Sequence, residues 1–357
     1  MQRNMTIDVA RGFTVFIMPA VHSMVTYSTP VVQHSLLGQI LGFLAEGPGA
    51  ELFMLLMGLC ISYGRKKSKK QILARSFKLL CLAYFLNFIK IILPLYWDGI
   101  PVNVFTENHI PNNLSGWLLL IFMGDILQLA AIAYLVCGLL YQVRQFARLS
   151  IMLAAIVIIM SPLAWHIHSH NILPAAILNL FVGTPPRCFF PVFPWLAYPL
   201  IGVAMGHYIK TTKANLFYRI LFCFSTIFLL LGGLVAPLEP DMWEESFYRM
   251  GPGGTLKHLG IALSWYCLCF LLVNNIRANY VFRFLSWLSK NITLVYCLQW
   301  VVIFWLTPWF SYHHLGMKNT LISIFLTSSL TFLLTFLIPK IYSKVNKHLI
   351  FITKFNI

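Results

Sequence analysis

Charged residues are scarce in this sequence, and acidic residues are the scarcest: Asp and Glu together number 10 among 357 residues. Asp, Glu, Lys and Arg make up 10% of the chain, against about 25% in soluble proteins. This shortage excludes an ordinary soluble protein, and the 59% hydrophobic content predicts a polytopic membrane protein. We expect residues 1–357 to form a single integral-membrane domain, because no stretch is polar enough for a separate soluble one.

Several motifs are also missing. No CxxC pair or zinc-ligand spacing occurs, and the cysteines lie mostly within apolar segments, so we expect packing residues and not a disulfide framework. His166, His168 and His170 have no carboxylate or cysteine beside them, so we expect no bound metal. The first apolar segment contains charged residues and lacks a small-x-small site, which argues against a cleavable signal peptide.

Apolar stretches of membrane-spanning length recur along the chain. They predict an all-α, polytopic transmembrane helix bundle of about ten spans, centred near residues 17, 56, 83, 129, 157, 200, 227, 265, 297 and 329. No internal repeat or low-complexity tract interrupts this pattern.

The basic residues are distributed unevenly between the connections. If the N-terminus is cytoplasmic, most of the 26 Lys and Arg residues fall on the inner side, as the positive-inside rule requires. The outer side receives the basic residues Lys90, Arg187, Arg249, Lys257 and Lys318 and the acidic group Glu239, Asp241, Glu244 and Glu245. We therefore expect both termini in the cytoplasm, a lipid bilayer as partner, and no nucleic acid.

The first span, residues 6–27, contains Asp8, Arg11 and His22. A charge in hydrocarbon costs several kcal/mol, so each is a candidate functional residue. Eleven residues turn a helix about 20° past three full turns, so Arg11 and His22 share one face roughly 16 Å apart. Asp8 lies one turn before Arg11, where it can neutralise the guanidinium. The alternative for His22 is a packed, hydrogen-bonded histidine of the core.

Other polar residues accompany the following spans. Glu51 lies near the outer end of the second span, and Asp125 lies inside a later apolar segment with Gln128 one turn on. The second span is followed by the basic residues Arg65, Lys66, Lys67, Lys69 and Lys70, and the third opens with Arg75 and Lys78. A basic run of this kind is also what a simple stop-transfer signal looks like.

These motifs resemble two related families of membrane enzymes. Arg11 followed after ten residues by His22, the segment GAELFMLLMGLCISY and the Arg75-x-x-Lys78 pair resemble the integral-membrane acyltransferase-three family, with Lys78 where that family has Arg. The order of GDILQLAAIAYLV, FPWLAYPLIGVAMG and SKNITLVY resembles relatives of heparan-alpha-glucosaminide N-acetyltransferase. The resemblance covers roughly residues 5–305.

The resemblance implies transfer of an acyl group, such as acetyl, from cytoplasmic acyl-CoA to a carbohydrate or glycan at the outer face. Acyl transfer needs a base and groups that stabilise oxyanion charge, and imidazole suits the first task near neutral pH. Catalysis would then fall to His22, Arg11, Glu51 and Asp125, with Glu51 orienting His22. The coenzyme would bind to Arg65, Lys66, Lys67, Lys69, Lys70, Arg75 and Lys78.

His34 and Gln128 complete the expected site as residues that bind the acceptor. In the heparan-type enzymes the reactive histidine follows the first helix, in the region of His34, so His22 and His34 both stay candidates. Two other functions also remain open: a proton-coupled small-molecule transporter, and a membrane sensor or scaffold without activity. We expect a multi-pass protein of a bacterial inner or plasma membrane, and its oligomeric state is left open.

Overall fold

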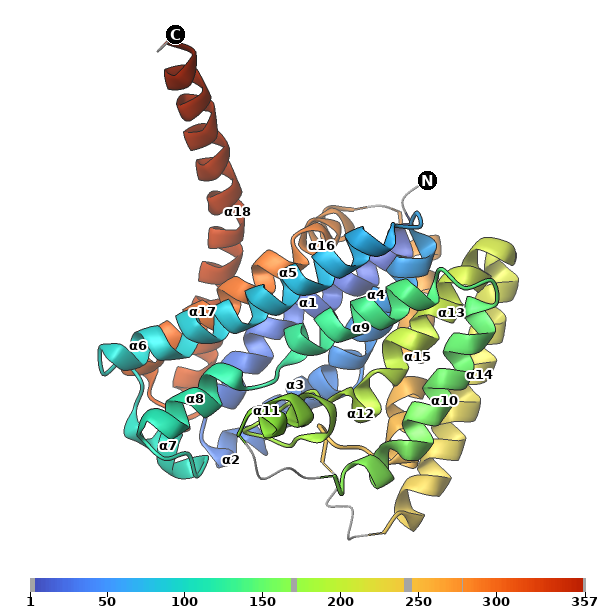
Figure 1. The fold of residues 1–357 in the computed structure, drawn as a ribbon, viewed down its shortest axis with the longest axis horizontal. Coiled ribbons are helices and arrows are strands. Elements are labelled where there is room, and N and C mark those ends of the chain that lie inside the picture. The colour runs from blue at the N-terminus through green and yellow to red at the C-terminus, as the bar shows by residue number, and fades with distance from the viewer. Residues whose placement is uncertain (1–3, 168–171, 241–245, 278, 356–357) are drawn as a thin grey trace.

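The computed structural model describes residues 4–167, 172–240, 246–277 and 279–355, and these residues form helices and no strand. Nine helical stretches in this part of the chain are long and apolar enough to cross a membrane. Figure 1 shows them packed side by side into one bundle, with the last helix leaving it toward the C-terminus. The prediction of an all-α polytopic bundle is confirmed, whereas the cytoplasmic placement of the termini stays a prediction.

The membrane-length stretches consist of one or more helices each. They are α1 (Met5–Tyr27), α3 (Leu36–Glu46) with α4 (Ala50–Tyr63), α5 (Lys69–Asn87) with the π-helix η1 (Phe88–Ile92) and α6 (Leu93–Tyr96), α10 (Phe146–Ala164), α12 (Val192–Trp195) with α13 (Ala197–Thr211), α14 (Ala214–Val235) with the 3-10 turn η2 (Ala236–Leu238), α15 (Pro252–Asn275), α17 (Ile292–Phe310) and α18 (Met317–Phe355).

Shorter helices fill the connections: α2 (Pro30–Gln33), α7 (Val102–Glu107), α8 (Leu114–Phe122), α9 (Ile126–Leu140), α11 (Ile172–Val182) and α16 (Tyr280–Lys290). The span expected near residue 129 is α9, which has only 15 residues. The other expected spans each coincide with one of the membrane-length stretches.

Helix α1 lies at the centre of the bundle and packs against α3, α4, α15, α16, α17 and α18. It begins at Asn4, whose side chain accepts hydrogen bonds from the amides of Thr6 and Ile7. Gly12 allows a close approach to α16, because a Cβ there would collide with the backbone carbonyl of Leu285. The central position explains why α1 is mostly buried and why its polar residues meet several other helices.

The break between α8 and α9 is built into the sequence Gly124-Asp125. Gly124 pairs with the chain around Cys188 through backbone hydrogen bonds to Arg187 and Phe189, and a Cβ at Gly124 would press against the Cys188 sulfur. Asp125 then starts α9 with a capping box: its Oδ1 accepts from the amide of Ile126 at 2.7 Å. The break therefore fixes a carboxylate inside the bundle.

Lys90, which the sequence analysis counted with the outer side, lies within η1 of a membrane-length stretch, and only 1% of its surface is exposed. Its side of the membrane stays a prediction. A π-turn holds one residue more than an α-turn and is frequent at functional sites. Here it accompanies a lysine that faces the interior of the bundle.

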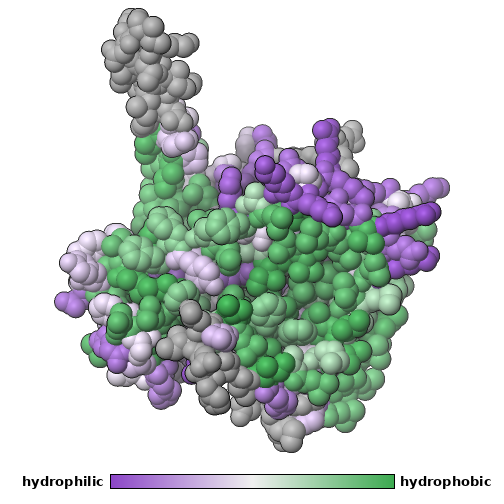
Figure 2. Space-filling view, viewed as in Figure 1, coloured by the Kyte–Doolittle hydropathy of each residue, from purple (hydrophilic) through white to green (hydrophobic). Residues whose placement is uncertain are grey.

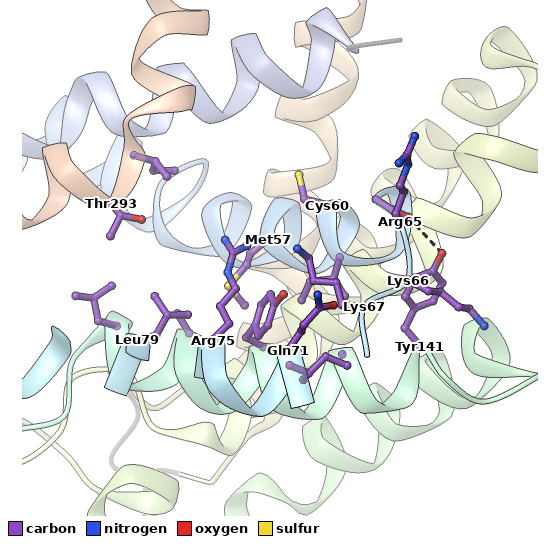
Figure 3. A pocket seen from close by; sticks show the side chains of 18 of the residues that line it. Met57, Cys60, Arg65, Lys66, Lys67, Gln71, Arg75, Leu79, Tyr141 and Thr293 are labelled. Atoms are coloured by element: carbon purple, nitrogen blue, oxygen red, sulfur yellow. Dashed lines mark hydrogen bonds between the residues drawn. The ribbon is translucent and has the colours of Figure 1, made fainter. Parts of the chain in front are cut away.

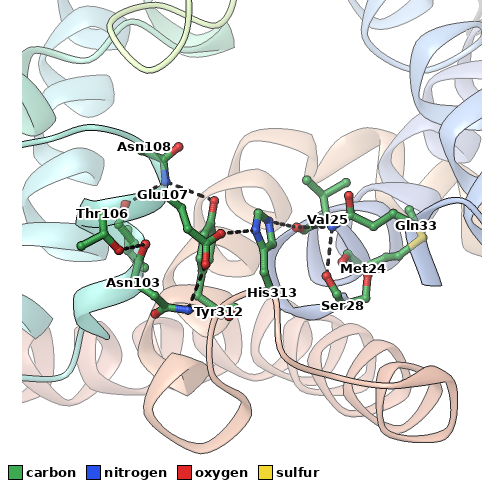
Figure 4. A network of polar contacts seen from close by, with 11 residues as sticks. Met24, Val25, Ser28, Gln33, Asn103, Thr106, Glu107, Asn108, Tyr312 and His313 are labelled. Atoms are coloured by element: carbon green, nitrogen blue, oxygen red, sulfur yellow. Dashed lines mark hydrogen bonds and ion pairs between the residues drawn. The ribbon is translucent and has the colours of Figure 1, made fainter. Parts of the chain in front are cut away.

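The two ends of the bundle differ in character. The basic end carries Arg65 to Lys70 and the start of α1; Figure 2 shows hydrophilic residues along this edge, above a broad apolar surface. At the opposite end, which we call the loop end, His313 donates to Glu107 at 2.6 Å and contacts the Val25 carbonyl at 3.1 Å (Figure 4). This contact joins α7 to the end of α1 and to the loop before α18.

Candidate functional site: a cationic cavity and a buried polar cluster

A cavity of about 540 Å³ opens at the basic end. Five cationic side chains line it, and they come from α1, from the loop after α4 and from α5: Arg11, Arg65, Lys66, Lys67 and Arg75. In Figure 3, Arg75 of α5 and Met57 of α4 point toward each other across this space. The arrangement suits an anionic ligand with an apolar portion, because the deeper wall is formed by apolar residues such as Phe53 and Leu127.

Aromatic rings hold two of these cations in place. The guanidinium of Arg75 lies 5.0 Å from the Tyr134 ring centroid, and the ammonium of Lys66 lies 5.2 Å from that of Tyr141. Burial raises the pKa of the Tyr141 phenol, whose hydroxyl donates to the Gly64 carbonyl at 3.4 Å. The two rings therefore hold these cations beside the cavity.

The other basic residues predicted to bind the coenzyme do not line the cavity. Lys69, Lys70 and Lys78 are exposed on α5. Arg11, predicted to be catalytic, lines the cavity and donates to the Cys60 sulfur at 3.5 Å. Asp8, expected to neutralise Arg11, accepts a hydrogen bond from Ser289 at 3.1 Å.

A buried ion pair forms the second part of the site. Lys90 Nζ lies 3.2 Å from Asp125 Oδ2, with side-chain exposures of 2% and 10%. The same ammonium lies 4.7 Å from the ring centroid of Trp300 and 5.7 Å from that of Phe304. A buried charge is tolerated when it is paired and hydrogen-bonded, and here η1, α9 and α17 provide the partners together.

His22 lies beside this ion pair. Its imidazole stacks on Trp300 with ring centroids 4.2 Å apart and planes inclined by 23°. It interacts electrostatically with both Asp125 and Lys90, and the amide of Gln299 lies next to it. The ring is partly accessible, although its Nδ1 atom is buried. The structure thus brings together two of the predicted catalytic residues, His22 of α1 and Asp125 at the start of α9. Lys90 of η1 pairs with Asp125 and lies near His22.

Several buried polar atoms around His22 have no hydrogen-bond partner. They are His22 Nδ1, the Tyr296 hydroxyl, both amide atoms of Gln299 and the indole nitrogen of Trp300. Tyr296 lies near Asp125 and Trp300 without a regular hydrogen bond to either. An unpaired buried polar group costs about 1 to 3 kcal/mol. These atoms lie on α1 and α17, which pack against each other.

The cationic cavity ends close to this cluster. It reaches Thr293 of α17 and Leu127 of α9, and Tyr296 lies one turn beyond Thr293, an axial rise of about 4.5 Å. Asp125 is two residues before Leu127. On α17 the cavity therefore ends one turn before Tyr296 and about two turns before Trp300, which stacks on His22.

Glu51 has a different partner from the one we expected. Its Oε1 accepts a hydrogen bond from His258 Nδ1 at 2.7 Å, and none of its side chain is exposed. Its Oε2 is buried without a partner, as is the hydroxyl of Tyr198. The orienting contact that we predicted for His22 is thus made to His258 of α15.

The two residues predicted to bind the acceptor are placed differently from each other. His34 is exposed at the end of α2, where its Nδ1 contacts the Pro30 carbonyl at 2.7 Å. Gln128 is buried, accepts from the Asp125 amide at 3.0 Å and donates to the Met123 carbonyl at 3.1 Å. Gln128 thus holds the turn before α9.

Two groups of residues from the sequence analysis, the three histidines near residue 168 and the acidic group near residue 241, belong to the loop end. His166 and Glu239 are described, whereas the other members of their groups, His168, His170, Asp241, Glu244 and Glu245, lie outside the described residues. Glu239 accepts a hydrogen bond from the Gly253 amide at 2.6 Å, at the start of α15.

Sequence reasoning missed Lys90, Tyr296, Gln299, Trp300 and His258. A signal existed for Lys90, because it interrupts the apolar run FIKIILPLY and a charge in a span needs a partner. Tyr296, Gln299 and Trp300 lie near the middle of the span expected around residue 297, and the sequence does not show which helix they face.

The fold and the site define a multi-pass membrane protein with a cationic cavity at the basic end and a partly accessible histidine farther along α1, an arrangement that suits an anionic ligand. Residues 3–232 match the family described as heparan-alpha-glucosaminide N-acetyltransferase, catalytic. This is more than half of the chain, which therefore belongs to that family, as the sequence motifs predicted. No curated protein matches the sequence.

The family is one of membrane acetyltransferases that take the acetyl group from acetyl-CoA. The matched residues include α1 to α13 and most of α14. His258, Tyr296, Gln299 and Trp300 lie beyond them. The part of the site that the sequence did not predict is thus largely the part outside the family match.

Proposed function

We propose that the chain transfers an acetyl group from acetyl-CoA, bound in the cationic cavity, to a carbohydrate or glycan that enters from the loop end. The observation that carries the proposal is that the cavity reaches Thr293 of α17, about two helical turns before Trp300, on which His22 stacks. Family membership supports the donor. The acceptor and the direction of transfer are part of the proposal.

Each part of acetyl-CoA has a matching wall in the cavity. Arg65, Lys66 and Lys67 at the mouth provide positive charge for the phosphates, and Arg75 provides a planar guanidinium that can bind two phosphate oxygens. The apolar wall at Phe53 suits the extended pantetheine arm. The thioester would then approach the cluster on α17.

His22 is the base in this proposal. Its imidazole would accept the proton of the acceptor while Trp300 fixes the plane of the ring. The Lys90 ammonium, held by Asp125, offers positive charge where the carbonyl oxygen becomes negative. Arg11, Lys69, Lys70 and Lys78 have no direct part in this chemistry.

The test separates donor binding from transfer. Native membranes that contain the chain would be incubated with radiolabelled acetyl-CoA, and label transferred to membrane material would be counted. His22→Ala is expected to reduce transfer by about 100-fold or more, the usual contribution of a general base. The affinity of the purified variant for acetyl-CoA, measured by calorimetry, is expected to change by less than about twofold.

His34→Ala is the matched control, because His34 is the other candidate histidine and is exposed at the loop end. It is expected to keep full transfer activity. Loss of transfer in His34→Ala with full activity in His22→Ala would reverse the assignment and contradict the mechanism.

A further inference from the structure

A second hollow lies at the basic end and shares none of its described lining residues with the cationic cavity. It has a volume of about 350 Å³ and lies between the start of α1 and α16, which pack against each other (Figure 1). We call it the α1–α16 hollow, and the described residues that line it are Met5, Asp8, Arg283, Ser286, Trp287 and Lys290. None of these residues takes part in the proposed acetyl transfer.

The register of α16 directs its basic residues toward the α1–α16 hollow. Arg283 and Lys290 are seven residues apart, so they lie within about 20° of each other around the helix and about 10.5 Å apart along its axis. Ser286 lies between them, one turn from each, on the same face. Both cations are exposed, and the Arg283 guanidinium lies 4.5 Å from the ring centroid of Tyr280. The hollow is therefore flanked by two positive charges with a hydroxyl group between them.

The carboxylate of the hollow is placed differently from the cations. Asp8 is only 8% exposed, and its Oδ1 accepts a hydrogen bond from Ser289 at 3.1 Å. Because Asp8 is buried whereas Arg283 and Lys290 are exposed, a ligand that approaches from outside meets positive charge first. The α1–α16 hollow therefore suits an anion.

The opposite face of α16 fixes this wall of the hollow against the bundle. Phe282, Leu285 and Leu288 are buried and belong to one apolar cluster with Val9 and Val15 of α1. The basic residues thus project from a helix that is held by its apolar face, and the positions of their backbone atoms are set by the fold.

A row of aromatic rings extends from the hollow along α1. The ring centroid of Trp287 lies 5.8 Å from that of Phe284, which lies 6.1 Å from that of Phe16. Phe16 in turn stacks on Phe332 of α18 with centroids 5.9 Å apart. Phe284 is 38% exposed and Phe16 is 45% exposed, and Phe16 lies about 12 Å beyond Asp8 along the axis of α1. This aromatic row offers an apolar surface that begins at the hollow and continues along a membrane-length helix.

We infer that the α1–α16 hollow binds the phosphate group of an anionic membrane phospholipid, whose acyl chains lie along the aromatic row. Guanidinium and ammonium groups form strong hydrogen bonds with anionic oxygens such as those of a phosphate, and basic pockets between helices at the membrane surface bind anionic lipid head groups. A free phosphate ion would pair with the cations but would leave the aromatic row without a partner, whereas a phospholipid matches both. The inference is independent of the acetyl donor and of the acceptor.

The first experiment measures lipid selectivity with the purified full chain in detergent. Native mass spectrometry gives the Kd of the first bound lipid for dioleoyl phosphatidylglycerol and for dioleoyl phosphatidylcholine, which have the same acyl chains. The wild type is expected to bind phosphatidylglycerol at least about fivefold more tightly, the contribution of one cation near a membrane surface. Arg283→Gln combined with Lys290→Gln is expected to reduce this preference to less than about twofold.

Lys69→Gln combined with Lys70→Gln is the matched control for charge. It removes the same charge from exposed positions at the same end of the bundle, and it is expected to keep the preference for phosphatidylglycerol. An unchanged preference in the variant at residues 283 and 290, or an equal loss in this control, would overturn the inference.

The second experiment tests the aromatic row. Phe284→Ala is expected to weaken phosphatidylglycerol binding by about threefold or more, because contacts between the ring and an acyl chain are lost. Phe222→Ala replaces another exposed phenylalanine, on α14, and is expected to leave the Kd unchanged. Equal Kd values for these two variants would remove the acyl chains from the site and overturn the inference.

Competition with the wild type separates a lipid from other phosphates. sn-Glycerol 3-phosphate, which has the phosphate without acyl chains, and acetyl-CoA are each expected not to displace phosphatidylglycerol at equal concentration. Displacement by glycerol phosphate would show a site for free phosphate, and displacement by acetyl-CoA would make the hollow part of the donor site. Either result would overturn the inference without any substitution in the chain.

Discussion

The cavity at the basic end and the cluster around His22 differ in how exposed their charged side chains are and in how many helices hold them. Three cations of the cavity, Arg65, Lys66 and Lys67, are exposed and follow one another in a single loop. The Lys90–Asp125 pair is buried and depends on η1, α9 and α17 together. Exposed charges can be changed one at a time at small cost, whereas the buried pair has to be changed as a unit.

The largest effect is expected when one member of the buried pair is removed. Lys90→Met leaves Asp125 as an uncompensated buried charge, which costs about 3 to 5 kcal/mol of stability in comparable sites. We expect a marked fall in the thermal midpoint in detergent and a loss of acetyl transfer of about 100-fold or more. Lys78→Met, an exposed lysine of α5, is the control and should change neither.

The double variant Lys90→Met with Asp125→Asn tests the reason for that loss. Asn also caps a helix well, and removal of both charges avoids the unpaired carboxylate. We expect the thermal midpoint to recover by more than half while transfer stays low. If Lys90→Met were as stable and as active as Lys78→Met, the buried pair would have neither role.

Substitutions in the cavity are expected to have smaller effects than those in the buried pair, and to change the apparent KM for acetyl-CoA and not the stability. Arg65→Gln combined with Lys67→Gln removes two cations that line it, so the apparent KM for acetyl-CoA should rise about tenfold, or roughly 1.4 kcal/mol, with little change in kcat. Lys69→Gln with Lys70→Gln removes the same charge from positions outside the cavity. This second variant should raise KM by less than about twofold. If both variants raised KM equally, the positive charge of the whole basic run would attract acetyl-CoA, and the cations that line the cavity would have no special part in binding.

The contact between Glu107 and His313 at the loop end should matter least. The Glu107 side chain is 43% exposed and that of His313 is 27% exposed, so a coupling of about 0.2 to 1 kcal/mol is expected. A double-mutant cycle with Glu107→Gln and His313→Ala, read as thermal midpoints, measures it. A coupling above about 2 kcal/mol would mean that this contact holds the loop end closed against α1.

The sequence predicted the features that depend on local composition. Apolar length located the spans, the register of α1 gave Arg11 and His22, and the basic run gave three of the five cations of the cavity. The sequence could not show which polar side chains on different helices pair with each other. Glu51 was matched with His22 instead of His258, because helix order does not say which faces meet. Gln299 and Trp300 carried no sign of their role, since it arises only where α17 packs beside α1.

The π-turn at Phe88–Ile92 should be visible when homologous chains are aligned. Each residue of an α-helix advances it by about 100°, so the extra residue of the turn sets the direction of Lys90 relative to the rest of α5. Among homologous chains, loss of this residue should leave a single-residue gap in the third span and turn a lysine at that place toward lipid. We therefore expect the gap and the absence of the lysine to be inherited together.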